Sequence, residues 1–232
     1  MKNTRYIFIL VVSTALMACE KDNYNPPNAQ LRGQLLYQGE PIHVEYDRVS
    51  YDLYQDGFGK KGPLTSTFTQ EGTFSQLLFD GEYKMVIPSG QGPFVPLQTD
   101  DGGADTILID LRGSADVDVE VTPFWMIRNP QLTVEDGGAV ATFALEQIAT
   151  GDNARDIESV TLYVSKTLFA NAQTNVATAS LEGAAITDVD NVRLSVAVPE
   201  LVPTQDYVFA SIGVKFAGVD DLLFSPTQKL SL

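Results

Sequence analysis

The chain has 232 residues, and its 30 acidic residues outnumber the 15 basic ones, which gives a formal net charge of −15. Such a charge repels the phosphates of nucleic acids and anionic lipid headgroups, so neither is expected as a binding partner. A single cysteine excludes an intramolecular disulfide, and a single histidine excludes a site of clustered histidines. A Cys–His catalytic pair is not expected either, because the sequence around Cys19 predicts an acylated cysteine and so leaves no free thiol.

The first segment has the pattern of an exported lipoprotein. Lys2 and Arg5 precede an apolar run over residues 6–17, which is shorter than the roughly 20 residues that span a bilayer. A basic start, a short apolar run and small residues before a cleavage point are typical of a secretory signal. Leu16-Met17-Ala18-Cys19 resembles a bacterial lipobox. We therefore expect a signal peptide over residues 1–18 and acyl chains on Cys19.

Residues 19–29 are polar, contain two prolines and show no periodicity, which predicts an extended tether. Glu20-Lys21-Asp22, directly behind the cysteine, resembles the surface-export signal of Bacteroidota lipoproteins. An ordinary polar linker is the alternative. We expect the protein on the outer membrane, held there by lipid on Cys19 and facing the cell exterior.

Residues 30–124 are predicted to form a first β-sandwich. Val49, Tyr51 and Leu53 alternate with polar neighbours, and this period of two residues indicates strands with one buried face. Turn signals separate the predicted strands at residues 38–41, 70–73 and 80–82. The acidic residues that alternate with valines over 116–121 are interpreted as the solvated face of a strand rather than as a metal cluster.

Residues 129–232 are predicted to form a second β-sandwich. Pro123 and Pro130 fix the chain direction over a bridge at 121–130, where we place the domain boundary. About seven strands follow in roughly 100 residues, which is typical of an immunoglobulin or fibronectin type III sandwich. The segment 201–207 resembles the fibronectin type III corner. The prediction is an all-β chain of two domains in tandem, each able to fold alone.

The sequence offers little catalytic chemistry. No Gly-x-Ser-x-Gly elbow accompanies His43, so nucleophilic catalysis is not expected. Among 30 acidic residues some pair satisfies any spacing, so glycoside hydrolysis is not indicated either. Three carboxylates around two glycines, at Asp100, Asp101 and Asp105, are candidate calcium ligands, and residues 188–191 are a second candidate. No other cofactor is expected.

Aromatic side chains in predicted loops are the candidate ligand-binding residues. Their flat apolar faces match the C–H faces of sugar rings, while acids and amides supply hydrogen bonds. The alternative is packing in the core or, for the single tryptophan, packing between the domains. The candidates are Trp125, Phe124, Tyr54, Phe58 and Phe94.

Several short motifs together resemble a known family. Gly33, then residues 39–42, 69–74 and 81–85, resemble the carboxypeptidase-regulatory, or prealbumin-like, sandwich, a module without catalytic residues. With the lipobox, the Val-Thr-Pro-aromatic bridge and the fibronectin-like end, their order resembles lipoproteins of domain-of-unknown-function family 3823. That resemblance implies a non-enzymatic accessory glycan-binding protein of a Sus-like polysaccharide-uptake system, with a SusC/SusD-like complex as partner. The alternative is a structural or adhesive surface spacer or a fimbria-type component.

Overall fold

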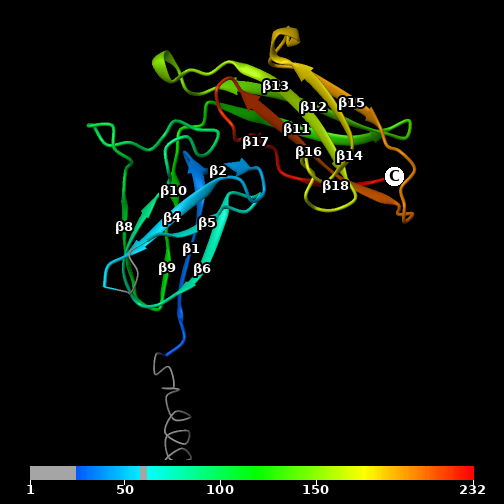
Figure 1. Cartoon of the computed structure of the whole chain (residues 1–232). Helices are drawn as coiled ribbons and strands as arrows, with labels where there is room; N and C mark the ends of the chain where they lie inside the picture. The colour runs from blue at the N-terminus through cyan, green and yellow to red at the C-terminus, as the bar shows by residue number, and fades with distance from the viewer. Residues whose placement is uncertain (1–24, 58–61) are drawn as a thin grey trace, which may run out of the picture.

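The computed structural model describes residues 25–57 and 62–232, so the predicted lipidation site Cys19 and the candidate Phe58 lie outside the described residues. Strands dominate the described part, where the helical elements are two short 3₁₀ turns, η1 (Gly151–Asn153) and η2 (Gly183–Ala185). The prediction of an all-β chain with two β-sandwich domains in tandem is confirmed (Figure 1). No helix among the described residues is long and apolar enough to cross a membrane.

Two sheets form the first domain. The strand β1 is the centre of one sheet, since it pairs antiparallel with β2 and β6 and parallel with β9 and β10. The other sheet has the order β5-β4-β7-β8. The strand bounds are β1 (Ala29–Tyr37), β2 (Glu40–Pro41), β4 (Ser50–Gln55), β5 (Leu64–Thr67), β6 (Thr73–Leu78), β7 (Gly81–Val86), β8 (Ile107–Leu111), β9 (Ser114–Asp116) and β10 (Val119–Glu120).

Alternation along the strands of the first domain determines which side chains fill its core. On β4, Tyr51 and Leu53 are buried, whereas Tyr54 points to solvent, because successive side chains of a strand face opposite sides. The Tyr51 ring lies 4.9 Å from that of Phe68 and 5.1 Å from that of Phe74, measured between centroids. This aromatic cluster holds the two sheets together.

The second domain also packs two sheets. One has the order β11-β12-β15, and the other has the order β14-β13-β16-β17-β3, with β18 also beside β16. The strand bounds are β3 (His43–Val44), β11 (Trp125–Glu135), β12 (Gly138–Gln147), β13 (Ile157–Ser165), β14 (Asn175–Glu182), β15 (Val192–Ala197), β16 (Tyr207–Phe216), β17 (Leu223–Phe224) and β18 (Gln228–Ser231).

The two domains are joined by a shared sheet and a shared core. The strand β3 lies within the sequence of the first domain, yet it extends the second domain's sheet by pairing with β17. The carbonyl oxygen of Phe124 accepts hydrogen bonds from the backbone N–H groups of Ile148, at 3.0 Å, and Ala149, at 3.2 Å. The Phe124 ring contacts that of Phe216, with centroids 5.7 Å apart. Buried residues of both domains therefore form one continuous apolar cluster.

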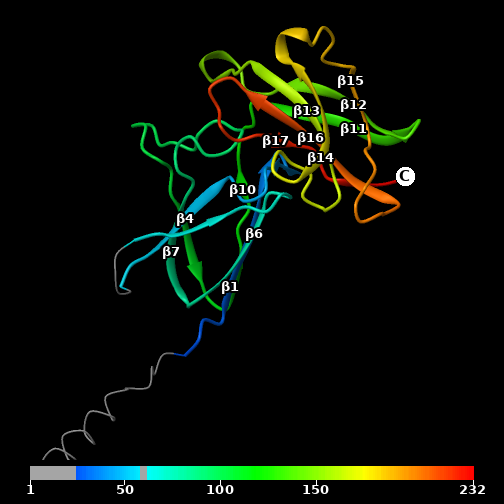
Figure 2. The same ribbon diagram turned by 45° about the vertical axis from the view of Figure 1, so that its right-hand side comes forward.

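The joint sets the orientation of the domains. The second domain lies across the top of the first in both views, and the chain enters the first domain from the opposite end (Figures 1 and 2). Just before β17, the buried carboxylate of Asp221 accepts a hydrogen bond from the backbone N–H of Gly92 at 2.7 Å. An isolated half would expose this apolar and hydrogen-bonded surface to water.

Candidate functional site

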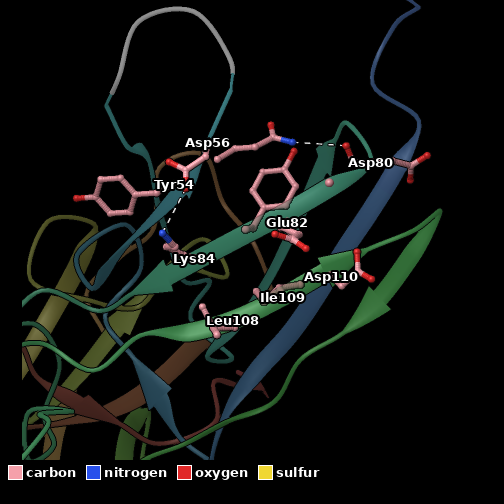
Figure 3. A pocket seen from close by; sticks show the side chains of 11 residues that line it. Tyr54, Asp56, Asp80, Glu82, Lys84, Leu108, Ile109 and Asp110 are labelled. Atoms are coloured by element: carbon pink, nitrogen blue, oxygen red, sulfur yellow. Dashed lines mark hydrogen bonds and ion pairs between the residues drawn. The ribbon is translucent and has the colours of Figure 1, made fainter.

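The main candidate site is a hollow in the first domain, over one end of the sheet β5-β4-β7-β8 (Figure 3). Its volume is about 570 Å³. We call it the Tyr54 hollow. It is lined by Tyr54, Gln55, Asp56, Asp80, Gly81, Glu82, Tyr83, Lys84, Leu108, Ile109 and Asp110.

Strand register brings three side chains of the Tyr54 hollow into one row. Tyr54 on β4 pairs with Lys84 on β7, and Lys84 pairs with Leu108 on β8. Directly paired residues of neighbouring strands point to the same face of a sheet, so the three side chains lie side by side. Tyr54 is 39% exposed and Leu108 is 75% exposed. The row therefore presents an aromatic and an aliphatic surface to solvent on either side of an ammonium group.

Most polar groups of the Tyr54 hollow already have partners. The Lys84 ammonium lies 3.3 Å from a carboxylate oxygen of Asp56, as the dashed line in Figure 3 marks. Asp80 accepts a hydrogen bond from the backbone N–H of Gly113 at 2.7 Å. Asp110 pairs with Arg112 at 2.9 Å.

Glu82 differs from these acids. Its side chain has no hydrogen bond or ion pair to any of the described residues, although it lies on the same face as Lys84 and pairs in register with Asp110. Its carboxylate is free to accept hydrogen bonds from a ligand. The hollow thus combines an apolar surface with one uncommitted acceptor.

Tyr83, between Glu82 and Lys84 on β7, points to the buried side of the sheet that carries the Tyr54 hollow. The Tyr83 hydroxyl donates to the carbonyl oxygen of Phe79 at 2.9 Å. Burial raises the pKa of Tyr83, which keeps the hydroxyl protonated as a donor. Gln55 also donates to the carbonyl oxygen of Asp80, at 3.5 Å.

The hollow lies at the end of the domain where β1 begins. Gly113, which donates to Asp80, accepts a hydrogen bond through its carbonyl oxygen from Gln30 at 2.8 Å. Gln30 is the second residue of β1. The Tyr54 hollow is therefore close to the point where the chain enters the domain.

A second hollow, of about 400 Å³, is built around Trp125 in the second domain. Trp125 is half-buried, and its indole N–H donates to the carbonyl oxygen of Arg155 at 2.8 Å. It lies beside η2 and β13 of its own domain, and not between the two domains. We call this site the Trp125 hollow. It is lined by Trp125, Asp156, Ile157, Gly183, Ala184, Ile186 and Val189.

Two of the other aromatic candidates are not available to a ligand. Phe94 is 1% exposed and Phe124 is 3% exposed, so neither can stack on a sugar ring in this structure. As candidate ligand-binding residues these two are wrong, and the alternative of packing in the core holds for both. Phe94 forms an isolated β-bridge with Pro123, which places both phenylalanines in the apolar joint. Apolar neighbours in the sequence on both sides of each ring were the available signal.

The acidic glycine-rich loop is a hydrogen-bonded turn. The Asp101 carboxylate accepts hydrogen bonds from the Thr99 hydroxyl and, at 3.4 Å, from the backbone N–H of Gly103. These bonds lower the pKa of Asp101. Asp105 accepts a hydrogen bond from the backbone N–H of Thr106 at 2.8 Å.

Asp101 and Asp105 therefore form hydrogen bonds to groups of their own loop. Nowhere in residues 25–57 and 62–232 do three or more histidine, cysteine or acidic side chains come together as metal ligands. Asp188, in the second acidic segment, likewise accepts a hydrogen bond from the backbone N–H of Asp190 at 3.0 Å. Calcium binding at Asp100, Asp101 and Asp105 stays a prediction.

The fold and the two hollows define a class of protein, an all-β chain of two tandem β-sandwiches that share a core, with the Tyr54 hollow on the first and the Trp125 hollow on the second. The model described as the DUF3823 protein of unknown function, N-terminal domain, matches residues 29–122. The model of the DUF3823 C-terminal domain of unknown function matches residues 125–229. The chain belongs to the DUF3823 family, as its motifs predicted.

Solved structures of relatives have the same architecture. A DUF3823 protein from Parabacteroides merdae is 31% identical, with a TM-score of 0.76 over 89% of this chain and 100% of that one. A DUF3823 protein from Bacteroides ovatus is 26% identical, with a TM-score of 0.75 over 88% and 99% of the two chains. A Bacteroides uniformis protein described as a candidate carbohydrate-binding protein is 15% identical, with a TM-score of 0.70 over 89% and 100%. Among curated proteins, none matches this chain.

Proposed function

We propose that this protein is a non-enzymatic, lipid-anchored protein of the outer membrane that binds a neutral glycan at the Tyr54 hollow. In this role it would serve a polysaccharide-uptake system as an accessory protein beside a SusC/SusD-like complex. The observation that carries the proposal is the row of Tyr54, Lys84 and Leu108, with the uncommitted Glu82 carboxylate on the same face.

The chemistry of the row suits a sugar ring. The exposed Tyr54 face can pack on the C–H face of a pyranose. Glu82 can accept hydrogen bonds from sugar hydroxyls, and Lys84 can donate to a ring or hydroxyl oxygen if it leaves Asp56. The fold relative from B. uniformis, described as a candidate carbohydrate-binding protein, supports this ligand class.

Charge favours neutral over anionic glycans. Four carboxylates and a single lysine line the Tyr54 hollow, in a chain with a formal net charge of −15. Sulfated or uronic sugars would meet repulsion at this site. With one aromatic face and few polar contacts, we expect affinities on the order of micromolar to millimolar.

The test is affinity electrophoresis and calorimetry against plant, host and microbial glycans, with and without calcium. Tyr54→Ala should lower affinity about tenfold or more and leave the melting temperature unchanged, because Tyr54 is exposed and outside the core. Tyr46→Ala is the matched control. It removes another exposed tyrosine, whose ring is tilted against that of Phe169 with centroids 4.3 Å apart and lines neither hollow.

A negative result would favour the second candidate function. If no glycan binds under any condition, the shared core between the domains supports a rigid surface spacer instead.

The lipid anchor is tested separately. Cys19→Ser should release the protein into a soluble fraction or leave its precursor uncut. Normal processing and membrane fractionation of that variant would refute the lipoprotein assignment.

A further inference from the structure

The Trp125 hollow lies in the second domain, beside the segment that contains η2. The segment that follows β14, which contains η2, stands at the top of both views, and the chain enters the first domain at the bottom (Figures 1 and 2). The Tyr54 hollow belongs to that lower domain. The two hollows therefore lie on different domains and cannot hold the same sugar ring.

Hydrogen bonds fix the indole ring of Trp125 before any ligand arrives. Its N–H is held by the carbonyl oxygen of Arg155, at 2.8 Å. The Arg155 guanidinium in turn donates to the carbonyl oxygens of Ala154, at 2.7 Å, and Asp152, at 3.2 Å, and lies 5.4 Å from the centroid of the Phe124 ring. An aromatic face held in place in this way loses little conformational entropy when a ligand packs on it.

The other wall of the Trp125 hollow is also fixed. At Gly183 a Cβ atom would lie 1.8 Å from the carbonyl oxygen of Ile157, so only glycine allows η2 to approach β13 this closely. Beyond η2 the wall continues with Ile186 and Val189, and Val189 is exposed. The close backbone contact keeps the apolar wall opposite Trp125 in position.

A single charged side chain lines the hollow, and it is uncommitted. The Asp156 carboxylate has no hydrogen bond or ion pair with the described residues, and Arg155 next to it is already engaged. A carboxylate at the edge of an aromatic and aliphatic surface can accept hydrogen bonds from two neighbouring hydroxyl groups. Charge at this position would repel an anionic sugar.

We infer that the Trp125 hollow is a second ligand site, which takes one neutral pyranose ring with its C–H face on Trp125 and vicinal hydroxyls on Asp156. This goes beyond the proposed function, because it shares the ligand class but does not depend on the Tyr54 hollow. A site on each domain makes the protein bivalent for a long polysaccharide. Bivalency raises the affinity for the polymer through effective concentration and leaves the affinity for short oligosaccharides unchanged.

Trp125 is the sole tryptophan of the chain, so its fluorescence reports on this hollow alone. The experiment is a titration of the purified full-length protein with the neutral tetrasaccharides of cellulose, xylan, mannan and starch. It follows the emission maximum and the quenching of Trp125 by acrylamide. We expect at least one of these probes to shift the emission and to reduce acrylamide quenching about twofold or more.

Variants separate the two sites. Tyr54→Ala should leave the fluorescence response intact. Asp156→Ala should weaken it about tenfold, whereas Asp152→Ala, which removes the same charge from an exposed position outside the hollow, should not. With the matching polysaccharide, Asp156→Ala should lower affinity at least about tenfold through the loss of bivalency. Val189→Ala is a further variant that removes apolar surface from the lining of the Trp125 hollow and should also weaken the fluorescence response. The Val189 side chain is exposed, so its loss should leave the fold intact.

Two results would overturn the inference. If tetrasaccharides bind in a Tyr54-dependent manner while acrylamide quenching of Trp125 stays constant, the second site is absent and the proposed function stands. If the fluorescence responds but neither Asp156→Ala nor Val189→Ala weakens the response, the ligand does not occupy this hollow. A response that persists while Tyr54→Ala has no effect on any binding would support the inference and refute the Tyr54 hollow.

Discussion

Replacing Phe124 by alanine tests whether the two domains depend on a common core. The side chain is 3% exposed and packs on the fully buried ring of Phe216 at the joint. Removing a buried phenylalanine costs about 3–5 kcal/mol of unfolding free energy, because apolar contacts are lost and a cavity is left. Total stabilities are about 5–15 kcal/mol, so the variant should lose a large fraction of its stability.

Equilibrium unfolding in urea, followed by both Trp125 fluorescence and far-UV circular dichroism, measures the effect. Trp125 begins the second domain, whereas circular dichroism reports on strands of both domains. In the native protein we expect the two signals to change together. In Phe124→Ala they should separate into two transitions as the joint weakens.

Controls define what would refute this reasoning. Phe124→Leu keeps most of the volume and should cost about 1 kcal/mol. Leu108→Ala removes a 75% exposed side chain and should stay within about 0.5 kcal/mol of the native protein. A loss below about 1 kcal/mol for Phe124→Ala, with the two signals still coincident, would mean that the joint contributes little and that each domain is stable by itself.

Three further changes have defined outcomes. Burial raises the pKa of Glu45 above 4.5, so the contribution of Glu45 to stability is full below about pH 4.5 and is lost as the pH rises through the raised pKa. Glu45→Gln should remove this dependence of unfolding free energy on pH, and the variant should unfold at a higher urea concentration than the native protein at pH 8. An unchanged pH dependence would contradict the prediction. Gly72→Ala should lose more than about 1 kcal/mol in urea unfolding, because Gly72 has a φ of +72° and its Cβ would lie 2.0 Å from the carbonyl oxygen of Ile42; native-like stability would refute the strained turn. Tyr83→Phe should lose about 1 kcal/mol with its hydrogen bond to Phe79, and a loss near zero in the same assay would show that the bond is not formed.

Local patterns in the sequence were enough to predict the strands and the sandwich class. Val49, Tyr51 and Leu53 alternate with polar residues, and this period fixes both the strand and its buried face. The same alternation places Tyr54 on the solvent side. Its neighbours Lys84 and Leu108 depend on the register of two other strands, which no local pattern specifies.

The joint between the domains was not predictable in the same way. The strand β3 has only two residues, too few to show a period, and its partner β17 lies about 180 residues further along the chain. Phe94 and Phe124 follow prolines and resemble loop residues, but the packing of the second domain on the first buries them. Their apolar neighbours in the sequence signal burial, but the distant segments that bury them are not specified by the adjacent sequence.

The position of β1 has a mechanical consequence. A pull on the chain at residue 25 acts along β1, which is held by antiparallel bonds to β6 over six residue pairs and by parallel bonds to β9 and β10. Force along a strand loads such bonds together in shear, instead of opening them one after another as in unzipping. A force applied at residue 25 would therefore be shared by β1 and the strands bonded to it before the first domain unfolds.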